Sequence, residues 1–157
     1  MPDFYQGTEL WDLSFVDPDN RRSVNFKIRK AYLEDIMERG DTNMSSLISE
    51  LLYLARDRRV KMFLIHRALK ARRALSEVFL QGDYLPLYAQ GSKKKKIVAF
   101  AKRFKEDDGA WALTVAPRIT TDLVDVGEYT LGTDVWRDTV LALPRGAPEQ
   151  WVNALTG

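Results

Sequence analysis

Apolar residues recur with a helical period in the first half of this chain and alternate in short runs in its second half. The spacing predicts three helices, at about 25–40, 44–56 and 60–75, joined by short connections that favour packed neighbours. The positions expected to face inward on these helices are Ile28, Ala31, Tyr32, Ile36, Leu47, Ile48, Leu51, Leu52, Ala55, Val60, Phe63, Leu64, Ala68 and Ala71.

Polar residues mark where the first two helices should begin. Asn25 and Asn43 each precede an apolar periodic segment, and an asparagine side chain there can accept a hydrogen bond from a free backbone N–H. Gly40 is the expected end of the first helix, because glycine commonly follows the last helical turn. Residues 1–24 show neither period and are predicted to form a loop.

Beyond Ser76 the pattern becomes one of short β-prone runs separated by turn residues. These runs are Tyr84–Gln90, Ile97–Lys105, Ala110–Pro117 and Val135–Leu143. In the second run the residues expected on one side are Val98, Phe100 and Lys102, and those expected on the other are Ile97, Ala99 and Ala101. Gly91-Ser92 and Glu106–Gly109 supply turn chemistry between the runs.

Helices followed by strands, without alternation of the two, predict an α+β fold with an antiparallel sheet. The change of pattern near Leu75–Gln81 divides the chain into an expected helical part at 1–75 and an expected β domain at 76–157.

Composition excludes several classes of site. The 24 basic and 22 acidic residues leave a formal charge of +2, too small to indicate a polyanionic partner. The chain has no cysteine and one histidine, His66, which excludes disulfides, thiolate zinc sites and multi-histidine metal sites. No apolar run approaches the roughly 20 residues that cross a bilayer, so the prediction is a soluble, cytoplasmic chain.

The N-terminal loop carries the most distinctive candidate chemistry. Aromatic faces stack on sugar rings, while amides, carboxylates and guanidinium groups hydrogen-bond hydroxyl pairs. The candidate sugar-binding residues are Tyr5, Gln6, Asp19, Asn20, Arg21 and Arg22. The same composition fits a surface loop whose arginines pair with Asp17 or Asp19, so composition alone leaves both interpretations open.

Other polar features favour structural explanations. Asp3 with Glu9, or Asp17 with Asp19, could form an acid–base pair, but such residues are more typical of turns and caps. The basic run at 56–73 resembles a nucleic-acid-binding face and fits a solvated helix face better. The lysines at 93–96 are expected to discourage strand pairing at a sheet edge.

The loop also carries a specific family signature. The segments Pro2–Ser14 and Val16–Arg22 resemble the region after the eighth barrel strand of the maltooligosyltrehalose synthases, members of the alpha-amylase superfamily. Gly82–Leu87 and Trp151–Gly157 are similar to the C-terminal domain of that family. Ser23 departs from the family, which usually has proline there and thus a more rigid loop.

The resemblance implies a C-terminal fragment, with helices from the end of a (β/α)8 barrel followed by an antiparallel β-sandwich domain that is truncated. The parent would be a (1->4)-alpha-D-glucan 1-alpha-D-glucosylmutase, which turns the reducing-end α-1,4 linkage of a maltooligosaccharide into an α,α-1,1 linkage. Its catalytic carboxylates would lie on earlier barrel strands, so the fragment should hold no catalytic residue, metal or cofactor and should be inactive alone.

The resemblance further implies that the six loop residues contact maltooligosaccharide in the full enzyme, with neither nucleic acid nor membrane as partner. Exposed barrel or sheet edges of the fragment could mediate self-association. The alternatives are a non-catalytic carbohydrate-binding or structural domain of another amylase-superfamily enzyme, and a basic nucleic-acid-binding module.

Overall fold

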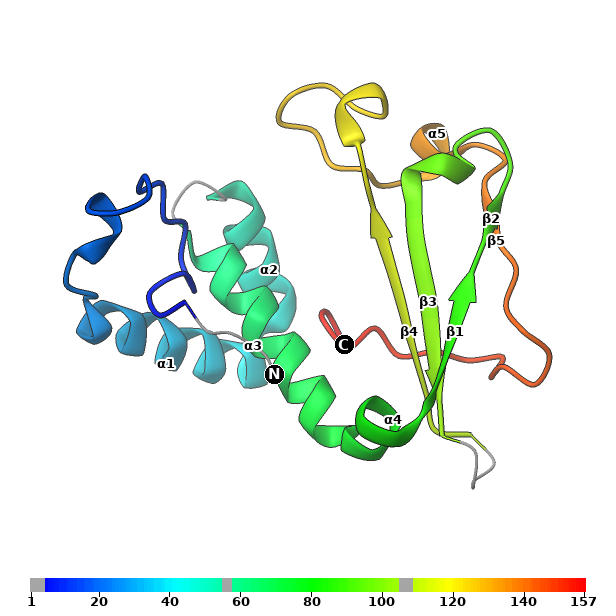
Figure 1. Cartoon of the computed structure of the whole chain (residues 1–157), viewed down its shortest axis with the longest axis horizontal. Coiled ribbons are helices and arrows are strands. Elements are labelled where there is room, and N and C mark those ends of the chain that lie inside the picture. Colours follow the sequence, from blue (N-terminus) through cyan, green and yellow to red (C-terminus); the bar gives the residue numbers. More distant parts are fainter. Residues whose placement is uncertain (1–4, 55–57, 105–108) are drawn as a thin grey trace. The chain divides into compact units, whose positions relative to one another are not determined.

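The computed structural model describes residues 5–54, 58–104 and 109–157 of the chain (Figure 1). Helices in the first part of the chain and antiparallel strands in the second confirm the α+β prediction. No helix among these residues is both long enough and apolar enough to span a membrane.

The chain divides into two compact units. The first comprises Met1–Arg73 and Val152–Gly157, and the second comprises Ala74–Trp151. The assignment of domains to 1–75 and 76–157 stays a prediction.

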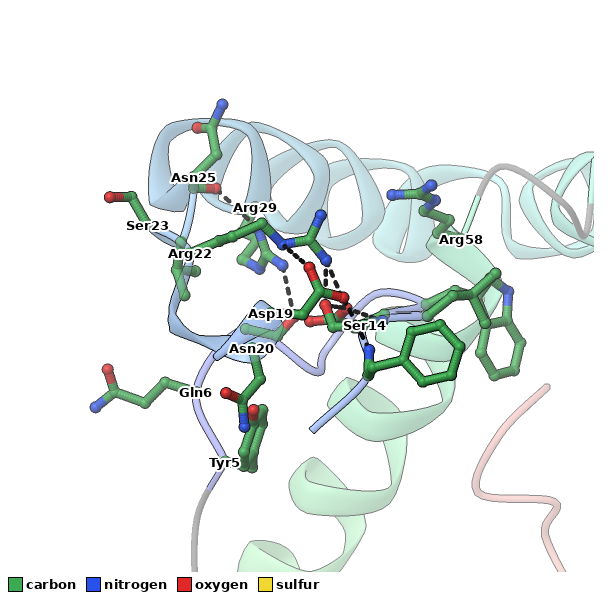
Figure 2. Close-up of a pocket in the computed structure, with 16 residues that line it drawn as sticks. Tyr5, Gln6, Ser14, Asp19, Asn20, Arg22, Ser23, Asn25, Arg29 and Arg58 are labelled. Carbon is green, nitrogen blue, oxygen red and sulfur yellow. Dashed lines mark hydrogen bonds and ion pairs between the residues drawn. The ribbon is translucent and has the colours of Figure 1, made fainter. Parts of the chain in front are cut away.

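The first unit contains three helices, α1 (Phe26–Thr42), α2 (Met44–Tyr53) and α3 (Arg59–Ala74). Both predicted N-caps are confirmed. The Asn25 side chain accepts a hydrogen bond from the Ile28 N–H, and the Asn43 side chain accepts one from the Ser46 N–H, each at 3.1 Å. The described residues before α1, 5–25, form turns, extended segments and one 3-10 turn, η1 (Asp19–Arg21), as expected for a loop (Figure 2).

Two predicted helix ends are wrong. Helix α1 continues through Gly40, because Asn43 closes α1 by donating its backbone N–H to the Arg39 carbonyl and also caps α2. Helix α2 ends at Tyr53, short of the predicted Arg56. Ala55 and Arg56 themselves lie outside the described residues.

The core of the first unit joins the N-terminal loop to all three helices. Its buried residues are Leu10, Ile36, Leu47, Leu51, Met62 and Phe63. Ile28, Ala31, Leu64 and Ala68 were expected to face inward but are exposed. Helix α3 carries apolar residues on more than one side, and the side that packs is set by neighbours that include Leu10 of the loop.

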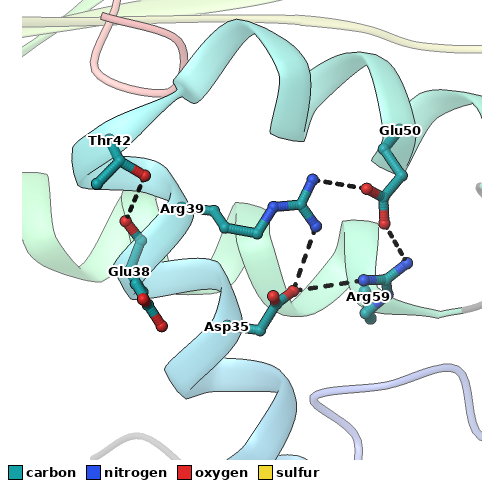
Figure 3. Close-up of polar contacts among 6 residues, drawn as sticks. All are labelled: Asp35, Glu38, Arg39, Thr42, Glu50 and Arg59. Atoms are coloured by element: carbon teal, nitrogen blue, oxygen red, sulfur yellow. Dashed lines mark hydrogen bonds and ion pairs between the residues drawn. The ribbon is translucent and has the colours of Figure 1, made fainter.

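An ion-pair network ties the three helices together (Figure 3). Glu50 of α2 accepts hydrogen bonds from Arg39 of α1 at 2.6 Å and from Arg59 of α3 at 2.8 Å. Asp35 of α1 lies 3.5 Å from both guanidinium groups. The two hydrogen bonds lower the pKa of Glu50 from 4.5 to about 2, and the bond to Glu50 raises the pKa of Arg39.

The second unit begins with a helix that the sequence did not predict, α4 (Ser76–Gln81). Its sheets are antiparallel, one in the order β1-β3-β4 and the other pairing β2 with β5. The strands are β1 (Asp83–Leu87), β2 (Ala89–Gln90), β3 (Ile97–Arg103), β4 (Trp111–Pro117) and β5 (Val140–Leu141), and the remaining short elements are η3 (Lys94–Lys96), η4 (Thr120–Asp122) and α5 (Thr133–Trp136).

The alternation predicted for β3 is confirmed. Ala99 and Ala101 are buried, whereas Val98 is exposed. On the face that includes Val98, Phe100 stacks on Tyr84 of β1 with ring centroids 5.0 Å apart. Side-chain alternation therefore sets the face that β3 buries.

Two predicted strands need correction. The run Tyr84–Gln90 divides at Tyr88 into β1 and β2, which join different sheets. The run Val135–Leu143 is mostly not a strand, since α5 occupies its start and only β5 remains. Here the Trp136 indole donates to the Thr130 carbonyl, six residues earlier, at 2.9 Å, a local contact made by the turn that replaces the predicted strand.

The lysine run lies in the turn between β2 and β3 rather than along a strand. Lys94–Lys96 form η3, and Lys96 pairs with Asp122 at 2.6 Å. Before it, the backbone N–H of Ser92 donates to the Asp138 carboxylate at 3.0 Å. The role of these lysines in discouraging strand pairing stays a prediction.

The Glu50 network should make stability depend on pH. Folding lowers the pKa of Glu50, so its stabilising effect is complete above pH 4.5 and is lost as the pH falls towards about 2. We expect Glu50→Gln to lower the thermal midpoint near neutral pH, and the difference from wild type to vanish near pH 2. Circular dichroism melts across this range measure it.

Glu34→Gln is the control, since the exposed Lys30–Glu34 pair, at 3.8 Å, should contribute little at any pH. A Glu50→Gln difference that stayed constant down to pH 2 would contradict the expected titration.

Gly91 tests the packing of the second unit. Its φ is +97°, and an added Cβ would lie 2.5 Å from the Asp138 carbonyl oxygen and 2.8 Å from the Thr139 Cα. Gly127 has φ +94° with open space around it. We expect Gly127→Ala to cost about 1 kcal/mol of unfolding free energy from backbone strain, and Gly91→Ala about 1–3 kcal/mol more from the clash.

Urea denaturation of both variants gives the comparison. Equal losses for the two glycines would show that backbone conformation alone accounts for the effect.

Candidate functional site

The N-terminal segment surrounds a cavity of about 500 Å³ (Figure 2). Five of the six predicted site residues line it: Tyr5, Gln6, Asp19, Asn20 and Arg22. The sixth, Arg21, lines a second hollow that shares Tyr5, Gln6 and Asn20 with the first. The structure therefore brings all six candidates together around these two hollows.

Arg29 of α1 holds the loop beside the cavity. Its Nε donates to the Glu9 carboxylate at 3.1 Å, and its two terminal nitrogens donate to the carbonyls of Gly7 at 2.5 Å and Asn25 at 3.1 Å. The side chain is 18% exposed, so these bonds are partly shielded from water. Gly7 is required here because a Cβ on its backbone, at φ +94°, would lie 2.9 Å from the Val24 side chain.

The carboxylates on the cavity wall are held by donors of the same loop. Asp19 accepts a hydrogen bond from the Phe15 N–H at 2.9 Å, and Asp12 accepts one from the Ser14 N–H at 2.9 Å. Hydrogen bonds from the Ser14 hydroxyl and backbone, followed by the charge of Arg22, lower the pKa of Asp12. This carboxylate is therefore a hydrogen-bond acceptor at neutral pH rather than a general acid.

Arg22 bridges the same group of residues. It donates a hydrogen bond to the Ser14 hydroxyl, and its guanidinium lies 3.7 Å from Asp12 and 3.8 Å from Asp19. Arg21 pairs instead with Asp17, four residues earlier. The pairing foreseen by the structural interpretation is thus present, and it orients side chains that also line a cavity.

Asn20 stands out because one of its polar atoms is unsatisfied. Its side-chain oxygen is buried and accepts no hydrogen bond from the described residues. Buried polar atoms normally have a partner, and an exception commonly marks a place where a water or ligand binds. In Figure 2 the Asn20 side chain lies beside Tyr5, whereas Gln6 points away from both.

Sequence reasoning missed two arginines of the cavity wall, Arg29 and Arg58. Arg29 lies one helical turn after the Asn25 cap. Its contacts with Glu9 and Gly7 join residues twenty or more positions apart, so the local sequence does not predict them. Arg58 was assigned to the basic helix face at 56–73.

Much of that basic face is engaged within the first unit. Arg59 belongs to the Glu50 network, the Lys61 ammonium lies 5.4 Å from the centre of the Trp11 ring, and Arg67 donates to the Ala154 carbonyl at 3.0 Å. Burial, followed by the charges of Lys70 and Arg67, lowers the pKa of His66. Within the described ranges no cluster of three metal-ligating side chains occurs.

Two tryptophans of the second unit differ in burial. Trp111 is buried, and Trp151 is 37% exposed with its indole N–H bonded to the Pro148 carbonyl. Of the carboxylate pairs, Asp3 lies outside the described residues, and Asp17 is taken up by its pairing with Arg21.

Comparison with known proteins gives a consistent set of relatives. No protein-family model matches the chain. Putative maltooligosyl trehalose synthases from two strains of Mycobacterium tuberculosis are each 34% identical over all 157 residues, and the chain spans 16% of their length.

Solved structures point to the same enzyme. A mutant maltooligosyltrehalose synthase from Arthrobacter ramosus matches 91% of this chain at 31% identity and a TM-score of 0.59. The match covers 16% of the enzyme's own chain. A second structure of that enzyme matches 89% of this chain at 29% identity and a TM-score of 0.52. The family resemblance of the motifs is therefore confirmed: the chain is similar, along its whole sequence and most of its fold, to a segment of maltooligosyltrehalose synthases.

Proposed function

We propose that this chain is the C-terminal part of a maltooligosyltrehalose synthase and that its N-terminal cavity binds part of a maltooligosaccharide. The observation that carries the proposal is the gathering of Tyr5, Gln6, Asp19, Asn20 and Arg22 around one cavity. The relatives of the whole chain, all named for a maltooligosaccharide-converting enzyme, support the same ligand.

The residues of the cavity suit a neutral, polyhydroxylated ring. Tyr5 is 55% exposed and offers an aromatic face for a pyranose ring. The Asn20 amide lines the cavity and can hydrogen-bond a sugar hydroxyl. Asp19 and Arg22 are already oriented by the loop, so little conformational entropy would be lost when they bind.

The chemistry would be carried out elsewhere in the enzyme. The proposed reaction isomerises the reducing-end α-1,4 linkage to an α,α-1,1 linkage through a glycosyl-enzyme intermediate, which needs a nucleophilic carboxylate and an acid. This chain would contribute binding and the exclusion of water, since hydrolysis competes with recapture of the freed glucose.

The finer architecture belongs to the same proposal. The helices α1, α2 and α3 would correspond to the end of a (β/α)8 barrel, and the sheets of the second unit to part of an antiparallel β-sandwich. The parent enzyme would act in the cytoplasm, and the separate fragment could self-associate through edges such as β4.

Two other functions remain weaker. A non-catalytic carbohydrate-binding domain would use the same cavity but would belong to an enzyme other than a maltooligosyltrehalose synthase. A nucleic-acid-binding module would rest on α3, where Arg59, Lys61 and Arg67 already have partners within the unit. Nucleic-acid binding that falls steeply with salt concentration would favour the nucleic-acid-binding module.

The isolated chain should be catalytically silent. Incubated with maltopentaose, we expect it to form no non-reducing product, because the proposed reactive carboxylates are not among its residues. Anomeric proton signals in NMR and an assay of reducing ends detect the conversion, with an intact maltooligosyltrehalose synthase as the positive control. Turnover by the chain itself would overturn this division of roles.

Asn20→Ala should weaken binding of maltopentaose about fivefold, since one hydrogen bond of about 1 kcal/mol is lost. Isothermal titration calorimetry on the full chain measures the affinity. Gln90→Ala removes an exposed amide of β2 outside the cavity and should bind as wild type does. If both variants bound equally well, Asn20 would not be a ligand contact.

A further inference from the structure

Arg58 is the residue immediately before α3, which begins at Arg59. It lines the same cavity as the N-terminal loop, although more than thirty residues separate it from Asn25 in the sequence. In Figure 2 it lies on the opposite side of the view from Tyr5 and Gln6. The cavity is therefore bounded by two segments that are far apart in the sequence.

The backbone of Arg58 is in an unfavourable conformation. Its φ is +80°, in the left-handed region that favours glycine and penalises residues with a Cβ. Among the described residues, two other non-glycine residues have positive φ, Ile119 at 51° and Arg137 at 53°, and both belong to the second unit. Strained backbone of this kind tends to occur at binding and catalytic sites, where the side chain's position matters more than the local cost.

The guanidinium of Arg58 also differs from its neighbours in having no partner among the described residues. Arg22 and Arg29, on the same cavity wall, are occupied by Ser14 and by Glu9. Arg59 pairs with Glu50. Arg58 is exposed and makes no hydrogen bond or ion pair with any residue the structure describes. Arg58 therefore lines the cavity with five donors that no described side chain or carbonyl occupies.

We propose that Arg58 is a substrate-binding residue, which donates hydrogen bonds to hydroxyl oxygens of the sugar held by the loop residues. Its fork of donors suits a pair of adjacent hydroxyls on a pyranose. The left-handed backbone is the local cost of presenting the side chain at this wall. The inference rests on the proposed sugar-binding function and adds a second wall to its site.

A glycine substitution at position 58 distinguishes the effect of losing the side chain from the effect of relieving the backbone strain. Arg58→Gly removes the guanidinium and relieves the backbone, so maltopentaose affinity should fall about tenfold while the thermal midpoint stays the same or rises. If Arg58 had only a structural role, Arg58→Gly would instead lower the thermal midpoint. Affinity is measured by isothermal titration calorimetry on the full 157-residue chain, and the midpoint by circular dichroism.

Arg137→Gly is the matched control, because it also replaces an exposed arginine at positive φ with glycine. It should leave maltopentaose affinity unchanged. Arg58→Asn provides a second test, since asparagine tolerates a left-handed backbone but lacks the guanidinium, and its affinity should fall as that of Arg58→Gly does.

The outcomes distinguish this inference from the function on which it rests. Wild-type chain that fails to bind maltopentaose overturns the sugar-binding function and this inference with it. Wild-type binding that Arg58→Gly and Arg58→Asn leave unchanged overturns only the role of Arg58. An equal loss of affinity in Arg137→Gly also overturns it, because the effect would then not depend on the cavity.

Discussion

The candidate site depends on the hydrogen bonds made by the guanidinium of Arg29. From a half-buried position on α1 it donates to the Glu9 carboxylate and to the Gly7 and Asn25 carbonyls, and so fixes both ends of the loop that lines the cavity. A loop of this polarity has little apolar surface to bury, and Leu10 is its only buried side chain among the described residues. Polar contacts to one helix therefore compensate for the weak hydrophobic anchoring of the segment.

The ion pairs within the loop fit both a surface loop and a sugar-binding wall. Arg22 with Asp12 and Asp19, and Arg21 with Asp17, are the local pairs expected of an ordinary surface loop. Exposed pairs of this type stabilise a fold only slightly. They do, however, restrict the orientation of side chains around a cavity, and preorganised donors and acceptors bind a ligand with a smaller entropic cost. Structural pairing and ligand binding are therefore compatible in this segment.

The sequence predicted the features that local chemistry determines. The caps at Asn25 and Asn43 and the alternation along β3 depend on nearby residues, and the structure has them as expected. Two errors have local causes that the apolar pattern does not reveal: Asn43 rather than Gly40 closes α1, and the Trp136 indole bonds the Thr130 carbonyl six residues earlier. The side of α3 that packs, by contrast, depends on distant neighbours such as Leu10. The six loop candidates could be chosen from a family signature, whereas Arg58 could not, because its place on the wall arises only when α3 approaches the loop.

All the described residues that line the cavity belong to the first unit. The geometry of the site therefore depends on the contacts of α1 and α3 with the loop, and the Glu50 network joins these two helices through α2. For an enzyme that must recapture a freed sugar, a wall held in this way has a clear advantage. In the proposed enzyme, a rim ordered by these contacts would limit the entry of water, so the intermediate would be attacked by the retained glucose more often than hydrolysed.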